Sequence, residues 1–257
     1  MIRYRSFIPV LLALCVTVGS VWAADNGVYL DQIGSTSTIT IEQNGAGNTV
    51  KGIGPALDTK AKVYGSDTTV SITQTGTGNQ LNMGINGGLG DTNSVSYSVT
   101  GNNGSATIDL NNSGTDLSDH NVVAITQGGN SASTSVTMTG SNNSLTATQT
   151  GGNTQSLSAT IAGEQITNTT SMTGGASNSA TLNLSSNKGT STIATVGASN
   201  SVTLTQSGAA GTTGHTTDLS ITGSSNSATI TQGGTIDTHV SITSVGNGNT
   251  LSITSHN

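Results

Sequence analysis

Side chains that commonly carry out catalysis or bind metals are few and scattered in this sequence. Asp116 and Asp119 could form a loose calcium loop, but they lack the regular Gly/Asp spacing of calcium-binding repeats, which favours a polar turn. The serines form no Ser/His/Asp arrangement, and the glycine-rich stretch Gly84 to Gly90 does not lead into a helix as a phosphate-binding loop would. No two histidines have a metal-ligand spacing, and we expect solvated surface positions for His120, His215, His239 and His256. The sequence therefore predicts no enzymatic activity, no metal site and no cofactor.

Asparagine, glutamine and glycine are the residues that do recur at regular spacing. The commonest unit is Gly-x-x-Asn-[Ser/Thr]-[Ala/Val/Leu], as in Gly45 to Val50 and Gly197 to Val202. The asparagines of four late copies, Asn178, Asn200, Asn226 and Asn249, are 22, 26 and 23 residues apart. A period near 23 is too short for a propeller blade and is typical of one coil of a β-solenoid.

Each period contains two alternating segments that must position these amides. One leaves the asparagine, as in Asn200-x-Val202-x-Leu204-x-Gln206, and the other enters the glycine, as in Val70-x-Ile72-x-Gln74. Side chains alternate between the two faces of a strand, so Asn, Val or Ala, Ile or Leu, and Gln share one face, whereas Ser and Thr cover the other. The sequence predicts an all-β, cross-β solenoid of stacked two-strand coils, with about nine coils and roughly eighteen strands.

The amides have a predicted structural role inside the coils. Stacked at about 4.8 Å, Asn and Gln can hydrogen-bond to their own copies as amide ladders, and glycine permits a tight turn between them. A one-residue slip would bury Thr and expose Ile, so the amides also fix the register. The residues to which we assign these ladders and turns are Gln43, Gly45, Asn48, Gln74, Gly76, Asn79, Gln127, Asn143, Gln149, Asn178, Asn200, Gln206, Asn226, Gln232 and Asn249.

The N-terminal segment and the charge indicate where the protein works. Residues 1–23 have Arg3 and Arg5, an apolar run and a small residue at Ala23, which predicts a secretory signal peptide. Residues 24–257 form the predicted solenoid domain and contain no cysteine. They have four basic and twelve acidic residues, a net charge of about −8, which argues against binding to nucleic acid or anionic lipid.

Two copies of a longer motif resemble the curlin repeat of bacterial curli subunits. Gln-x-Gly-x-Gly-Asn-x-[Val/Leu] occurs at Gln43 to Val50 and at Gln74 to Leu81, and the family's second glutamine corresponds to Gln127, Gln149, Gln206 and Gln232. The resemblance implies a secreted, self-assembling subunit of a functional amyloid fibre on a Gram-negative bacterium, with a role in cell adhesion and biofilm matrix. It also implies a nucleator subunit and an outer-membrane secretion channel as partners, and no small-molecule substrate.

The sequence departs from that family in several places. Residues 24–28 are too few for the family's glycine-rich targeting segment, and four glutamine positions hold other residues, Val99, Met138, Thr195 and Ile221. Residues 51–67, with three lysines and Pro55, are predicted to be an irregular insert loop.

Two other functions fit the same sequence. Outward Thr-x-Thr pairs such as Thr203 and Thr205 resemble those of ice-binding β-solenoids, and β-propensity alone also explains them. A non-polymerising surface adhesin built from the same repeats is the other alternative.

Overall fold

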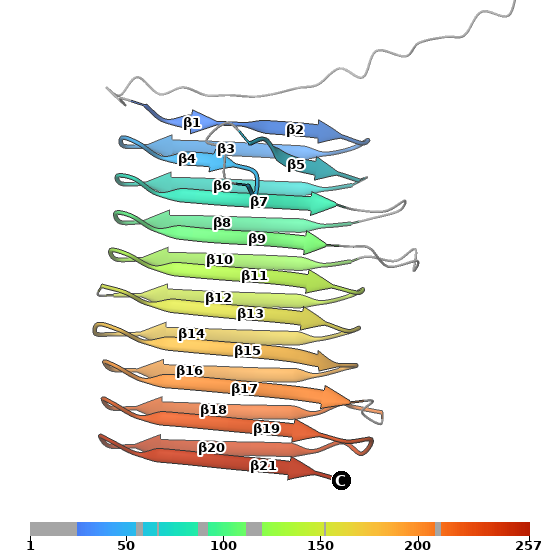
Figure 1. Ribbon diagram of the computed structural model, residues 1–257, viewed down its shortest axis with the longest axis vertical. Helices are drawn as coiled ribbons and strands as arrows, with labels where there is room; N and C mark the ends of the chain where they lie inside the picture. The colour runs from blue at the N-terminus through green and yellow to red at the C-terminus, as the bar shows by residue number, and fades with distance from the viewer. Residues whose placement is uncertain are drawn as a thin grey trace, which may run out of the picture.

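The computed structural model describes residues 25–54, 59–65, 67–86, 92–111, 120–151, 153–208 and 212–257. These residues form strands and turns, with no helix among them that could cross a membrane. They wind into a flattened solenoid of about nine turns, in which two sheets face each other along the whole stack (Figure 1). The predicted all-β solenoid is therefore confirmed, whereas the predicted signal peptide, Asp116 and Asp119 lie outside the described residues.

The two sheets contain alternate strands of the chain. Sheet A has twelve strands: β1 (Gly27–Val28), β2 (Leu30–Ile33), β4 (Thr49–Lys51), β5 (Ala61–Tyr64), β7 (Gln80–Asn86), β9 (Ser105–Asn111), β11 (Ser133–Thr139), β13 (Ser156–Ala162), β15 (Ser179–Ser186), β17 (Ser201–Gly208), β19 (Ser227–Gly233) and β21 (Thr250–His256). Sheet B has nine: β3 (Thr38–Asn44), β6 (Thr69–Thr75), β8 (Ser94–Thr100), β10 (Val122–Gly128), β12 (Ser144–Thr150), β14 (Thr167–Thr173), β16 (Thr190–Val196), β18 (Thr216–Thr222) and β20 (His239–Val245).

Every strand pairs in parallel with its counterpart in the next coil. Strands β17 and β19 show the register, since Val202, Leu204 and Gln206 lie opposite Ala228, Ile230 and Gln232. Because each coil repeats the same alternation, residues of one kind form columns that run along the solenoid. The first turn below denotes the turn from sheet B to sheet A, and the second turn the one from sheet A to sheet B.

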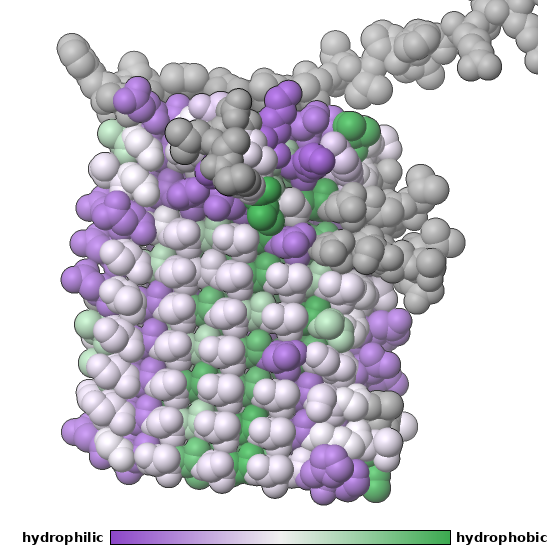
Figure 2. All heavy atoms as spheres, in the orientation of Figure 1, coloured by the Kyte–Doolittle hydropathy of each residue, from purple (hydrophilic) through white to green (hydrophobic). Residues whose placement is uncertain are grey.

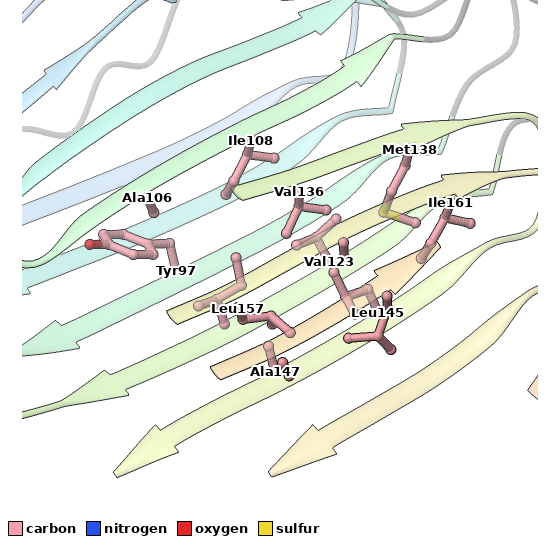
Figure 3. Close-up of a cluster of buried hydrophobic side chains, with 14 of the residues drawn as sticks. Tyr97, Ala106, Ile108, Val123, Val136, Met138, Leu145, Ala147, Leu157 and Ile161 are labelled. Atoms are coloured by element: carbon pink, nitrogen blue, oxygen red, sulfur yellow. The ribbon is translucent and has the colours of Figure 1, made fainter. Parts of the chain in front are cut away.

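The core is the narrow space between the sheets, filled by the inward half of each strand. Leu204 and Ile230 are fully buried, whereas Thr203 and Thr229, which directly precede them, are exposed. Each such Leu or Ile contributes about 1.5–3 kcal/mol through removal from water. Figure 3 shows side chains from both sheets meeting in this space, among them Tyr97, Val123, Leu145 and Ala147 from sheet B and Ile108, Val136, Met138, Leu157 and Ile161 from sheet A.

Glycine at the first turn is required by the stacking of the coils. Gly76 has φ of 122°, which L side chains rarely adopt, and a Cβ there would lie 1.8 Å from the carbonyl oxygen of Gly101 in the next coil. Gly45 stands in the same relation to Gly76, with a φ of 125° and a distance of 1.9 Å. The carbonyl of one glycine occupies the place where the side chain of the previous one would be.

The prediction of an irregular loop over 51–67 is wrong for several of its residues. Lys51 ends β4, and β5 holds Ala61 and Val63, both fully buried. Val63 pairs with Ile85 of β7 and with Gln32 of β2. Strands β4 and β5 therefore form one level of sheet A.

The described residues contain twenty-one strands rather than the predicted eighteen. One more arises because β4 and β5 are two halves of one level. The other two are β1 and β2, which form a further level at the N-terminal end. The predicted repeat did not include this level.

Candidate functional site

The inward asparagines connect successive coils at the turns. Asn79 is fully buried at a first turn. Its backbone N–H donates to Oδ1 of Asn48 (3.0 Å), its Nδ2 donates to the carbonyl of Gly101 (3.0 Å), and its Oδ1 accepts from the N–H of Gly104 (2.8 Å). Through its backbone N–H and its side chain together, one asparagine thus joins its own coil to the coils on both sides.

The same connection recurs at the second turn. The N–H of Asn143 donates to Oδ1 of Asn121 (3.1 Å), its Nδ2 donates to the carbonyl of Gly163 (2.8 Å), and its Oδ1 accepts from the N–H of Ile166 (2.9 Å). Asn121 was absent from the predicted site residues, although it opens the alternation that ends at Gln127.

These bonds differ from the predicted amide ladder. The asparagine side chains bind mainly backbone groups of the neighbouring coil, because the turn leaves an N–H and a carbonyl there that the sheets do not pair. A carboxamide supplies the matching acceptor and donor. A direct amide–amide bond accompanies them between Nδ2 of Asn226 and Oδ1 of Asn200 (3.2 Å).

Direct bonds between glutamines of adjacent coils form at two pairs. Gln43 donates to Oε1 of Gln74 (2.8 Å), and Gln206 donates to Oε1 of Gln232 (2.9 Å). Elsewhere the partner comes from the facing sheet. Gln127 and Gln149 both donate to the hydroxyl of Thr134, the latter at 3.3 Å.

The predicted site residues fall into four columns. The first turn holds Gly45, Gly76, Asn48, Asn79, Asn178, Asn200, Asn226 and Asn249, and the second turn holds Asn143. The last inward position of sheet B holds Gln43, Gln74, Gln127 and Gln149, and that of sheet A holds Gln206 and Gln232. The glutamines therefore lie near the first turn in the N-terminal half and near the second turn in the C-terminal half.

The four positions that depart from the glutamine pattern are buried as well, namely Val99, Met138, Thr195 and Ile221. Val99 lies between Gln74 and Gln127 in the sheet B column. Apolar and amide side chains are thus mixed within one column, and van der Waals packing replaces the amide bond at Val99.

The prediction that all four histidines are solvated is wrong for His215. This residue is 0% exposed, with Nδ1 2.8 Å from the hydroxyl of Thr238 and Nε2 3.2 Å from the carbonyl of Ser207. It occupies the second-turn position that Asn143 holds three coils earlier. The alternation His215-x-Thr217-x-Leu219 would have indicated this inward placement.

A further amide at the N-terminal end was missed from the sequence. Nδ2 of Asn26 donates to the carbonyl of Gly45 (3.0 Å), and its Oδ1 accepts from the N–H of Asn48 (2.8 Å). The signal was present, because Asn26-x-Val28-x-Leu30-x-Gln32 has the same inward residues as the segment that begins at Asn200.

Burial changes the acid–base behaviour of one core residue. Tyr97 lies in the middle of strand β8, and its hydroxyl donates to Oε1 of Gln127 (3.1 Å). Removal from water raises the pKa of this phenol well above its ordinary value. The group is thus a neutral donor in the core at any physiological pH.

The described residues offer little for catalysis. They contain no group of three or more His, Cys, Asp and Glu side chains placed to hold a metal ion. An open pocket of about 330 Å³ lies beside β5 and β7, where Lys60, Lys62 and Asp109 contribute its charged groups. What the arrangement does offer is hydrogen bonding from one coil to the next.

The outward faces form regular columns of hydroxyl groups. Figure 2 shows pale columns of weakly polar side chains along the molecule, with apolar residues between them. One column of sheet A contains Thr137, Thr160, Asn183, Thr205, Thr231 and Thr254. Charged side chains are rare there, so neighbouring copies at about 4.8 Å do not repel one another.

No protein-family model matches this chain, and no curated protein matches it.

Proposed function

We propose that this protein is a secreted structural subunit that self-assembles end to end into an extracellular fibre. The observation that supports the proposal is the exposed edge of the C-terminal coil, formed by β20 and β21. An unpaired parallel edge is a template for another strand, and here it also leaves the core partly open.

The inward side chains of β21 are incompletely covered. Leu251 and Ile253 of β21 are only partly buried, whereas Ala228 and Ile230, their counterparts in β19, are fully covered. A further coil of the same pattern would cover these side chains and pair the strand edges at once.

The amide at this end is available for a further coil. Asn249 is exposed, and its Nδ2 contacts Ser244 Oγ (3.2 Å) and the carbonyl of Val245 (3.4 Å) of its own turn. Its counterpart Asn226 instead donates to Gly246 of the next coil (2.8 Å). A second copy could supply the carbonyl that Asn249 lacks.

The biological setting follows from the predicted signal peptide and the resemblance to curlin repeats. In this proposal the protein leaves a Gram-negative cell through an outer-membrane channel and polymerises at the surface, with or without a nucleator subunit. The fibre then serves cell adhesion and forms biofilm matrix.

Electron microscopy and fibre diffraction of the purified protein test self-assembly. We expect unbranched fibres with a reflection near 4.8 Å from strands perpendicular to the axis. Ile253→Lys should abolish growth, because a second copy would bury its charge, whereas Ser252→Lys, which faces outward on the same strand, should permit it. A protein that stays monomeric at high concentration would contradict the proposal and favour the non-polymerising adhesin.

The hydroxyl columns favour a second candidate, binding to a regular surface such as ice. Rows about 4.8 Å apart with hydroxyls about 6.7 Å apart along each strand form a flat lattice. This candidate predicts thermal hysteresis from the monomer, which fibre formation alone would not produce.

A further inference from the structure

The two sheets do not contain the same number of levels. Along sheet A the described strands begin at β1 with β2 and end at β21, which gives ten levels, whereas sheet B runs from β3 to β20, which gives nine. The described solenoid therefore begins and ends in sheet A and contains half a coil more than a whole number (Figure 1).

This half coil matters for the stacking of two copies in the same direction. If β1 and β2 of one copy pair with β21 of another, β3 and β20 lie two levels apart, about 10 Å rather than about 4.8 Å. Sheet B would then lack one strand at every junction. If β3 instead pairs with β20, then β21 must occupy the level that β1 and β2 hold.

We propose that β1 and β2, here called the N-terminal rung (Gly27–Ile33), are a temporary edge strand that β21 of a second copy displaces. This inference rests on the proposed function, and it specifies how the subunits join. In the junction β21 pairs with β4 and β5, and β20 pairs with β3.

The incoming strand matches the one it replaces at three of four inward positions, with Ser255 in the place of Gln32. The inward residues of the N-terminal rung are Val28, Leu30 and Gln32, preceded by Asn26, and those of β21 are Leu251, Ile253 and Ser255, preceded by Asn249. In the new register Leu251 lies against Val50 and Ile253 against Ala61.

The asparagine bonds transfer with the strand. Asn26 accepts from the N–H of Asn48 and donates to the carbonyl of Gly45. Asn249 opens its strand in the same way and would take over both bonds. The exchange therefore restores the hydrogen bonds of the first turn.

The N-terminal rung is less firmly held than the other levels. It is broken at Tyr29 into strands of two and four residues, and its inward residue Val28 is 46% exposed. Strand β21 is seven residues long without a break.

Displacement also gives a pairing that the monomer does not have. The pairings of sheet A are exchanged for equivalent ones, while β20 against β3 adds seven residues of new ladder. Ile39 and Ile41, partly buried in the monomer, would be covered by Val240 and Ile242. The net gain in ladder and apolar burial drives the exchange.

A reversible crosslink tests the displacement. Asp31 and Lys62 are paired neighbours on the outward face of β2 and β5, within the Cα separation that a disulfide requires. Residues 24–257 contain no other cysteine, so Asp31→Cys with Lys62→Cys gives one defined bridge. Thr181→Cys with Thr203→Cys, paired between β15 and β17, is the matched control inside the solenoid.

We expect the oxidised 31–62 variant to lose seeded elongation and to regain it on reduction, while the oxidised 181–203 control elongates like the wild type. In wild-type fibres the amides of 27–33 should exchange hydrogen rapidly and those of 250–256 slowly. If the oxidised 31–62 variant grows as well as the wild type, the displacement is overturned but the fibre proposal stands. Absence of fibres from the wild type and the reduced variant would overturn both.

Discussion

Replacing Asn200 with alanine removes a side-chain amide that joins its coil to the next one. Nδ2 of Asn200 donates to the carbonyl of Gly223 (2.9 Å), and its Oδ1 accepts from the N–H of Asn226 (3.1 Å). Both backbone partners lie at a turn, where no sheet bond replaces the one that is lost. Each buried group left without a partner costs about 1–3 kcal/mol, so we expect Asn200→Ala to lower the free energy of unfolding by about 2–6 kcal/mol.

The loss should also be local, because each coil of a solenoid contacts only its neighbours. Urea unfolding followed by circular dichroism measures the stability, and hydrogen exchange locates the change. Amides of β15, β17 and β19 should exchange faster, while those of β6 and β8 should not change.

Two further variants make the interpretation specific. Thr203→Ala, outward and exposed on the same strand, should change stability by less than about 0.5 kcal/mol. Asn200→Asp keeps the acceptor, loses the donor and buries a charge, so it should destabilise at least as much as alanine. If Asn200→Ala costs no more than Thr203→Ala, the asparagine columns do not hold the coils together.

Three other perturbations test separate parts of the structure. Gly76→Ala should lower the free energy of unfolding by more than about 3 kcal/mol in a urea titration, because its Cβ would meet the carbonyl of Gly101 at a positive φ. Gly248→Ala is the control: this residue has a φ of 71° and open space around it, so the loss should be only about 1–2 kcal/mol. Burial raises the pKa of Tyr97, so the stability that depends on its neutral form is fully present below the ordinary pKa of about 10 and declines as the pH rises above it. Tyr97→Phe should reduce this alkaline decline in melting temperature, and an unchanged decline would show that Tyr97 is not its source. Nδ2 of Asn168 is buried without a hydrogen-bond partner among the described residues, and its Oδ1 accepts from the buried hydroxyl of Thr170 (3.1 Å). Asn168→Val together with Thr170→Val removes both partners of that bond and should raise the melting temperature, whereas a lower one would indicate that Nδ2 is satisfied.

The fold was predictable because its signal is local. Alternation of Val, Leu and Ile with Ser and Thr at a period of two marks each strand, and Gly with Asn marks each turn. Segments such as Ser201–Gly208 contain the whole pattern in seven or eight residues, so no distant contact was needed to recognise them.

The errors arose where a level depends on contacts from elsewhere in the chain. Strand β5 has only four residues, of which Lys62 is one, and its pairing with β2 and β7 makes it a strand. His215 is a polar residue on a short alternation, and its burial depends on Thr238 and Ser207 as partners. The amide columns were expected from composition, but their bonds to turn backbone follow from the shape of the turn.

Electron cryomicroscopy of fibres grown from the purified protein tests the central claim most directly. We expect strands perpendicular to the fibre axis and successive copies that all point in the same direction along it. At each junction β20 should pair with β3, and β21 with β4 and β5. Fibres in which the hydroxyl-covered sheet faces meet while the edge of β21 stays unpaired would contradict this claim.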